Sequence, residues 1–345
     1  MKAREKWGLV MLNRWIDTGS MNKARAKHTA SILANGKVLV TGGLYGFTLN
    51  SAELYDLSTE TWKTTSSMNA ARAGHTASIL ANGKVLVVGG RSGSIRIDAE
   101  LYDPLTETWK ITTNMNQERH GHTASMLPNG KVLVTGGSSS DSLNSAELYN
   151  PSTGTWRMTS KMNQGRYGHT ASVLPNGKVL IAGGFDGNLY LNSAELYDPL
   201  AEIWTTTSSM SMARRDHTAS VLLNGKVLVI GGSDSTFYLN SVELYDASTG
   251  IWTTTGNMDK TRPGYAAAVL TNGKVLVTGG SGTGSLKSTE LYDPSTETWT
   301  TTINMNNARK DHTASVLANG KVLVIGGNDG ILLNSAELYG PLTTT

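Results

Sequence analysis

Short apolar runs recur along the chain, and none of them has the length or the spacing of an amphipathic helix. In residues 75–80, "HTASIL" alternates apolar and polar side chains, and residues 84–90, "KVLVVGG", form a nearly continuous run of Val and Leu. Asn-Gly lies between the two runs. It is the strongest short-range hairpin signal, because a type I′ turn needs a positive φ at both central residues. Each pair of runs therefore predicts two antiparallel strands.

Two further strands follow in the same stretch. Residues 99–103 read "AELYD", and residues 108–113, "TWKITT", are rich in Thr and therefore prone to form a strand. The intervening "DPLTE" carries Asp and Pro, which suit a tight turn. The pattern predicts an all-β unit of four short antiparallel strands.

This unit, which runs from Met68 to Asn114, is one of seven copies spaced 47 or 48 residues apart. A Gly-Gly pair follows the second strand of every copy, at 42/43, 89/90, 136/137, 183/184, 231/232, 279/280 and 326/327. A tryptophan marks the fourth strand, at Trp15, Trp62, Trp109, Trp156, Trp204, Trp252 and Trp299. Four antiparallel strands at this period are typical of a propeller blade.

The marks of each copy resemble those of the kelch-repeat family: Arg-x-x-His at the start, Gly-Gly after strand two, Tyr in strand three and Trp in strand four. The resemblance covers residues 13–342, and kelch repeats share the fold of the central domain of galactose-oxidase-like proteins. It implies a ring of six or seven blades. Seven copies indicate a seven-bladed β-propeller of four-stranded antiparallel blades.

The first repeat tryptophan, Trp15, precedes any complete copy, and the last copy lacks one. We therefore predict that the N-terminal strand completes the last blade, which would comprise residues 305–340 together with 13–20. Residues 13–345 would form one propeller behind an N-terminal flank at 1–12. The ends of the chain would then be joined by main-chain hydrogen bonds within one sheet.

Composition narrows the possible functions. The 345 residues carry a net charge of +3 without a Lys/Arg cluster, which argues against a nucleic-acid partner. The absence of cysteine excludes disulfides and thiolate metal sites. The apolar run from Trp7 to Leu12 is too short for a membrane span or a signal peptide. We expect a monomer without a cofactor, cytosolic by default.

Because successive strands run in opposite directions, the loops lie alternately on two faces of the ring. The loops between strands two and three and those between blades share one face, here called the loop face; the Asn-Gly turns and the turns between strands three and four share the other, the turn face. The loop face carries all the length variation. It also carries the aromatic residues outside the repeat marks in the predicted propeller, which are Tyr45, Phe47, Tyr167, Phe185, Tyr190, Phe237, Tyr238 and Tyr265.

Charged residues fall on the same loops, at Arg91, Arg96, Asp141, Asp186, Asp234 and Asp329. Aromatic and charged side chains on the loops of a rigid scaffold are typical of a recognition surface. Except for Asp141, these charged residues join the aromatic ones as our candidate binding residues. Two alternatives stay open: the rings could pack between blades as anchors, and the charges could simply be solvated.

Histidine, arginine and glutamate each recur at a fixed position of the repeat. A histidine recurs in six copies, with Tyr265 in its place in the other; we expect a structural role, because equivalent side chains on neighbouring sheets start about 10 Å apart and cannot converge on one metal ion. The repeated arginines and the "AELY" glutamates predict buried bonds between blades. In kelch relatives such arginines also reach ligands. The secondary binding candidates are therefore Arg72, Arg119, His120, Arg166, Arg214, Arg215, Arg262 and Arg309.

The sequence thus favours a non-catalytic binding module for a protein segment, with a glycan as the next partner class. Copper-radical oxidases of similar fold need a Tyr–Cys crosslink, which a chain without cysteine cannot form. A cofactor-free sugar mutarotase or epimerase, which the resemblance also allows, remains an alternative. So does a repeat scaffold that has no evolved ligand.

Overall fold

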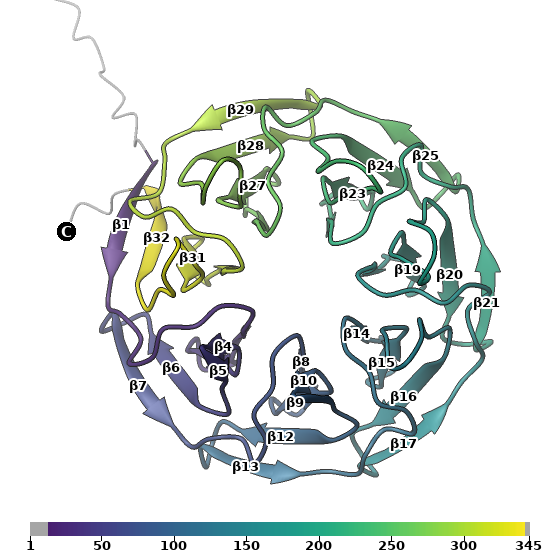
Figure 1. Ribbon diagram of the computed structural model, residues 1–345, viewed down its shortest axis with the longest axis horizontal. Helices are drawn as coiled ribbons and strands as arrows, with labels where there is room; N and C mark the ends of the chain where they lie inside the picture. Colours follow the sequence, from purple (N-terminus) through teal and green to yellow (C-terminus); the bar gives the residue numbers. More distant parts are fainter. Residues whose placement is uncertain (1–12, 342–345) are drawn as a thin grey trace, which may run out of the picture.

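The computed structural model describes residues 13–341, which form seven four-stranded antiparallel sheets arranged in a ring around a central opening (Figure 1). The prediction of an all-β, seven-bladed propeller is confirmed. Between residues 13 and 341 the chain forms no helix. The N-terminal flank expected at residues 1–12 and the last four residues of the chain lie outside this range.

Within each blade the strands follow one another from the opening to the outer edge. The first strands are β2 (Thr29–Ile32), β8 (Thr76–Ile79), β14 (Thr123–Met126), β18 (Thr170–Val173), β22 (Thr218–Val221), β26 (Ala266–Val269) and β30 (Thr313–Val316). The second strands are β3 (Val38–Thr41), β9 (Val85–Val88), β15 (Val132–Thr135), β19 (Val179–Ala182), β23 (Val227–Ile230), β27 (Val275–Thr278) and β31 (Val322–Ile325).

The third and fourth strands complete blades 1 to 7 in the same order. The third strands are β6 (Ala52–Asp56), β12 (Ala99–Asp103), β16 (Ala146–Asn150), β20 (Ala194–Asp198), β24 (Val242–Asp246), β28 (Thr289–Asp293) and β32 (Ala336–Pro341). The fourth strands are β7 (Thr61–Thr65), β13 (Thr108–Ile111), β17 (Thr155–Met158), β21 (Ile203–Thr206), β25 (Ile251–Thr254), β29 (Thr298–Thr302) and, in blade 7, β1 (Asn13–Thr18). Two small hairpins, β4 (Leu44–Tyr45) with β5 (Phe47–Thr48) and β10 (Arg91–Ser92) with β11 (Ser94–Ile95), extend the loops of blades 1 and 2.

The N-terminal strand closes the ring, as predicted. β1 pairs antiparallel with β32 along six residue pairs, from Asn13↔Pro341 to Thr18↔Ala336, and Trp15 lies opposite Tyr339. The Trp15 and Tyr339 rings have centroids 5.0 Å apart, the same arrangement as the Tyr–Trp pair of the other blades. The seam between the chain ends therefore has the structure of an ordinary blade.

The core lies between blades. Second strands are buried along their whole length, and each hydrophobic cluster combines side chains of two neighbouring blades. Leu39 of blade 1 packs with Val85 of blade 2, and Ile325 of blade 7 packs with Val40 of blade 1 across the seam. Because apolar area is shared between neighbours, each blade is stabilised by the two beside it.

Buried arginines brace each blade. Arg119 donates from Nη2 to Glu147 Oε1 (2.8 Å) and from Nη1 to the Gly136 carbonyl (2.7 Å), while Glu147 Oε2 accepts from the Asn116 N–H (2.7 Å). The same Arg–Glu pair occurs in all seven copies. Our expectation that these bonds join different blades was wrong. They join the loop that enters a blade to the second and third strands of that blade, because the loop folds back over them.

Buried histidines make the contacts between blades. His75 of blade 2 bonds through Nε2 with Thr29 Oγ1 of blade 1 (3.0 Å), and five other copies repeat this bridge to a threonine of the preceding blade. In blade 6 the Tyr265 hydroxyl takes this role: it donates to the Ile230 carbonyl (2.6 Å) and bonds with Thr218 Oγ1 (2.9 Å). Tyr265 is therefore an inter-blade residue, with 8% of its surface exposed.

Candidate functional site

Backbone pairing joins the two kinds of loop that form the loop face. The residue after the repeated arginine pairs with the start of the loop between strands two and three, as in Ala26↔Leu44, Ala73↔Arg91, His120↔Ser138, Tyr167↔Phe185, Arg215↔Ser233 and Lys310↔Asn328. These pairs fix the loops to the rigid blades. They place the loop residues around the central opening.

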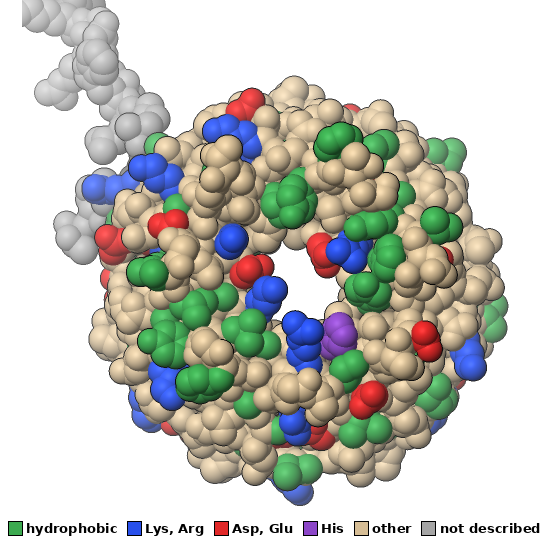
Figure 2. Space-filling model, viewed as in Figure 1, with side chains coloured by type: hydrophobic (Ala, Val, Ile, Leu, Met, Phe, Trp, Pro, Cys, Tyr) green, Lys and Arg blue, Asp and Glu red, His purple; other side chains and the backbone are tan. Residues whose placement is uncertain are grey.

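The opening is a cavity of about 680 Å³ lined by residues of the loop face. Figure 2 shows Lys, Arg, Asp and Glu side chains gathered around it. The charged side chains of its lining are Lys27, Arg91, Arg215, Asp216 and Asp311, and His28, His75, His120 and Tyr238 also line it. Both signs of charge thus face one recess.

The backbone around this opening is unusual at one position of each copy. The second residue after the repeated arginine has a positive φ, between 53° and 72°, in all seven copies. Four copies place glycine there, as the left-handed conformation favours. The other three carry a charged side chain, at Lys27, Asp216 and Asp311.

Two groups at the opening have shifted pKa values. Partial desolvation raises the pKa of the Asp216 carboxyl, and the negative charge of Asp311 adds to this, while the cations Arg215 and Lys27 oppose it. Desolvation, together with the positive charge of Arg91, lowers the pKa of His120. The charges of blades 1, 5 and 7 therefore act on one another at the recess, and Arg91 of blade 2 acts on His120 of blade 3.

Apolar side chains stand at the tips of the loops, in two sectors on opposite sides of the opening (Figure 2). In blades 1 and 7, Phe47 is 65% exposed and lies at the tip of the β4–β5 hairpin, and Ile331 is exposed in the neighbouring loop. In blades 4 and 5, Leu189 and Phe237 are exposed in the same way, with Phe237 at 70%. Asp141 and Gly284 occupy the corresponding positions in the loops of blades 3 and 6.

Three of the predicted aromatic residues form a cluster instead of standing free. The Phe185 ring packs edge-on against Tyr167 and Tyr190, with centroids 5.6 and 5.0 Å away, and the Arg215 guanidinium carbon lies 5.3 Å from the Phe185 centroid. These three rings are half-buried. These rings serve as anchors, because each buries much of its surface against its neighbours. Tyr45, Phe47, Phe237 and Tyr238 remain exposed.

The charged candidates divide in a similar way. Asp186 and Asp234 accept backbone N–H groups of their own loops, and those bonds lower the pKa of both carboxyls. Arg96 is paired with Asp98 (2.7 Å). Arg91 lines the opening and Asp329 is exposed on the blade 7 loop.

The secondary candidates also separate. The repeated arginines have at most 2% of their surface exposed and bond to carbonyls and glutamates, so they belong to the framework; these are Arg72, Arg119, Arg166, Arg214, Arg262 and Arg309. His120 and Arg215 line the opening.

Lys27, Asp311, Leu189 and Ile331 were not among the candidates predicted from the sequence. For Lys27 and Asp311 a signal existed: like Asp216, they interrupt a position that is glycine in the other copies.

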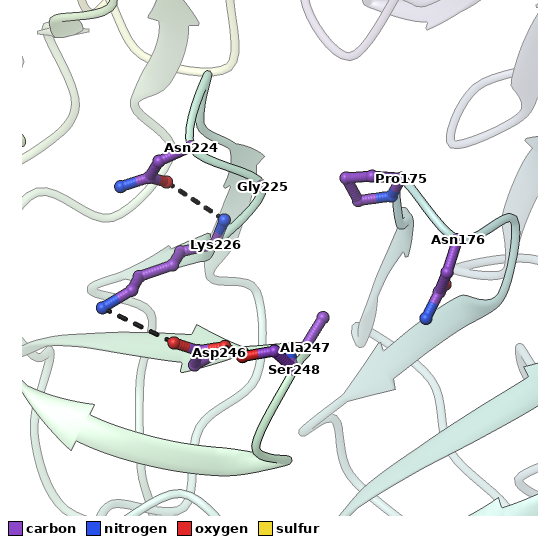
Figure 3. A pocket seen from close by; sticks show the side chains of 8 residues that line it. All are labelled: Pro175, Asn176, Asn224, Gly225, Lys226, Asp246, Ala247 and Ser248. Atoms are coloured by element: carbon purple, nitrogen blue, oxygen red, sulfur yellow. Dashed lines mark hydrogen bonds and ion pairs between the residues drawn. The ribbon is translucent and has the colours of Figure 1, made fainter.

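On the turn face a shallow recess of about 330 Å³ lies between the Asn-Gly turns of blades 4 and 5 (Figure 3). There Asn224 Oδ1 accepts the Lys226 N–H (3.1 Å), and Lys226 Nζ lies 3.7 Å from Asp246 Oδ2. Most blades repeat the same turn bond and a similar Lys–Asp pair. These contacts serve the turns themselves, so we place the candidate site on the loop face.

From residue 13 to residue 341, no three His, Asp or Glu side chains are grouped in a way that would hold a metal ion. The same part of the chain contains no helix that could cross a membrane.

The chain is similar to a protein-family model and to solved structures. The model of the KLHDC2/KLHL20/DRC7 Kelch-repeats domain matches residues 11–164, 74–267 and 121–327. No curated protein matched the chain. A solved structure of a fungal alcohol oxidase of the AA5 family, in complex with copper, superposes with a TM-score of 0.79 at 19% identity; the match covers 96% of this chain and 76% of that one.

At that identity the likeness to the oxidase concerns the fold alone. The family match is broader evidence, because its three overlapping segments together span residues 11–327. Kelch-repeat propellers are commonly protein-interaction modules. With this match, seven blades and the repeat marks in each of them, the chain belongs to the kelch-repeat family.

Proposed function

We propose that this propeller is a non-catalytic binding module that holds a segment of a partner protein on its loop face. The observation that carries the proposal is the arrangement of that face: two apolar sectors on opposite sides of a charged opening. An extended or helical segment that crosses the opening would contact both sectors and the charges between them.

The energetics of such a contact favour this face. Phe47 and Phe237 are large apolar groups that are already exposed, so burying them against a partner gains about 25 cal/mol for each Å² removed from water. The β4–β5 hairpin and the cross-loop pairs hold the loops in place before binding. A preformed surface lowers the entropy cost of association.

The charge pattern supports a protein partner over a nucleic acid. A nucleic-acid backbone requires a continuous positive track. Here Asp216 and Asp311 interrupt the cations around the opening. A glycan is the remaining alternative, since exposed aromatic rings also stack on sugars, and the experiment distinguishes the two.

The test is a selection of random linear peptides displayed on phage against the purified propeller. We expect peptides to be enriched, and the double variant Phe47→Ala/Phe237→Ala to bind them about tenfold or more weakly, as loss of central aromatic anchors does in other interfaces. The matched control is Leu105→Ala/Leu200→Ala, which truncates side chains that are even more exposed but lie in the turns between strands three and four.

The control should bind as the unmodified protein does, and both double variants should keep the melting temperature. If the turn-face control lost binding instead, the assignment of the face would be wrong. If no peptide were enriched and a glycan array bound through Phe47 and Phe237, the partner class would be wrong. If neither peptides nor glycans bound, the propeller would be a repeat scaffold without an evolved ligand.

A further inference from the structure

We propose that the central opening of the loop face selects a segment that carries an acidic and a basic side chain close together, and that Lys27, Asp216 and Asp311 determine this choice. The inference rests on the proposed function and names the chemistry of its partner.

The backbone at these three residues is strained. They have φ values of 54°, 53° and 55°, in the left-handed region that an L side chain disfavours. The equivalent residues of the other blades are Gly74, Gly121, Gly168 and Gly264. The fold therefore requires no side chain at this position. Strained residues that the fold does not need are concentrated at functional sites.

All three residues lie at the opening. The Lys27 N–H donates to the Asp311 carbonyl (3.0 Å), and the Asp311 N–H donates to the Gly264 carbonyl (2.7 Å). On blade 5, the Asp216 N–H donates to the Gly168 carbonyl (2.8 Å). Successive blades are thus linked at this position, so a side chain here stands directly at the edge of the opening.

The neighbouring glycines leave room for the two carboxylates. A Cβ at Gly168 would lie 2.8 Å from Asp216 Oδ1, and one at Gly264 would lie 3.2 Å from Asp311 Oδ1. Side chains at those positions would displace the carboxylates from the opening. Glycine in blades 4 and 6 and aspartate in blades 5 and 7 therefore form one arrangement.

Charges of both signs are distributed around the opening. Blades 1 and 2 contribute Lys27 and Arg91 to the opening, and blades 5 and 7 contribute Asp216 and Asp311. Within residues 13–341, the side chains of Lys27, Arg91 and Asp311 have no ion pair or hydrogen bond; Asp216 lies 3.4 Å from Arg215. The protein thus leaves charges of both signs exposed in one recess.

A partner with both signs of charge matches this recess. Its acidic group would lie toward Lys27 and Arg91 and its basic group toward Asp216 and Asp311. A purely acidic segment would meet the two aspartates, and a purely basic one would meet the two cations. Like charges brought together in a recess disfavour binding, which gives discrimination in addition to attraction.

The experiment compares peptides from the selection described above with synthetic versions in which the acidic residue, the basic residue or both are replaced by Gln. Fluorescence anisotropy measures their affinity for the propeller and for three single variants, Lys27→Gly, Asp216→Gly and Asp311→Gly. Each variant introduces the residue that other blades use at that position. The matched control is Glu60→Gly, which also has a positive φ (53°) but lies in a turn between strands three and four.

We expect the parent peptides to contain acidic and basic residues together more often than the unselected library does. Each glycine variant and each Gln replacement should weaken binding by about fivefold, the upper end for a partly exposed charge pair. The melting temperature should stay the same or rise in all four glycine variants, because each relieves strain. The double variant Asp216→Lys/Asp311→Lys should prefer peptides without the basic residue.

Several results would overturn the inference. Peptides that bind through Phe47 and Phe237, yet show no bias in charge and the same affinity for all glycine variants, would refute it while leaving the proposed function intact. Equal weakening by Glu60→Gly would refute it as well, since the effect would then be structural. If no peptide were enriched, the proposed function and this inference would fail together.

Discussion

At the scale of single residues, the propeller depends on polar side chains that are buried and paired with one another. Glu147 accepts hydrogen bonds from the Arg119 guanidinium and from the N–H groups of Asn116 and Gln117, and neither Glu147 nor Arg119 is exposed. A charge removed from water is tolerated only with close partners, and among the charged-group atoms of this pair only Arg119 Nε has none. The repeated arginines and glutamates are therefore the residues where substitution should be most costly.

The substitution Glu147→Ala should lower the free energy of unfolding by about 3–5 kcal/mol, because it leaves the Arg119 charge buried and unpaired. Urea denaturation followed by Trp fluorescence measures this change. The control is Glu118→Ala, an exposed glutamate in the same loop, which should change stability by less than about 0.5 kcal/mol. Equal effects of the two substitutions would contradict the role assigned to the pair.

The buried histidines should make the protein sensitive to acid. Burial, with the charge of the neighbouring arginine, lowers the pKa of His75, His169 and His312 to about 3, and the other three shift in the same direction. In the unfolded chain the pKa of each histidine would be about 6.5. Below that pH the unfolded state binds more protons, so each histidine removes about 1.4 kcal/mol of stability per pH unit.

We expect the melting temperature to be highest near neutral pH and to fall steeply between about pH 6 and pH 4, before most carboxylates are protonated. Thermal unfolding followed by circular dichroism across this range measures it. A melting temperature that stayed constant down to pH 4 would mean that the histidines are not held neutral in the folded state.

At the scale of elements, the strand that closes the ring holds the two ends of the chain in one sheet. β1 supplies the outer edge of blade 7, and the Trp15 indole N–H donates to the Ile303 carbonyl of blade 6 (3.0 Å). Without β1, the edge of β32 would present unpaired N–H and C=O groups to solvent.

Deletion of residues 1–20 should therefore destabilise the propeller and promote aggregation. Differential scanning calorimetry and light scattering measure the two effects. The substitution Trp15→Ala provides a milder test, with an expected loss of about 3–5 kcal/mol for a buried tryptophan. An unchanged melting temperature after the deletion would show that the contact between β1 and β32 contributes nothing to stability.

The elements were predictable from the sequence because their signals are local and repeated. Asn-Gly turns, Gly-Gly pairs and Trp15 in advance of the first complete copy were enough to give strand order, blade number and closure. The positions of the side chains in the loops were harder to predict from the sequence. Tyr265 looked like a loop aromatic, but it fills the space of a histidine between blades, and Phe185 looked exposed, but it packs with Arg215 from the next blade. Such contacts join residues far apart in sequence, so spacing alone does not reveal them.

At the scale of the whole molecule, the two faces of the ring differ in composition. The turn face repeats the same turn bonds and Lys–Asp pairs from blade to blade, whereas the loop face carries the exposed aromatic residues and the charged opening. A rigid ring keeps the loops of seven blades in fixed positions around one axis. Our account of function therefore depends on the loop face being the surface that a partner covers.

The most direct test of that claim is amide hydrogen exchange of the full chain with and without a peptide from the phage selection. The account predicts slower exchange in the loops between strands two and three of blades 1 and 5, at residues 44–48 and 233–239, and in the loops that line the opening. Exchange in the Asn-Gly turns should not change. Protection confined to the turn face, or to the outer strands, would contradict the account.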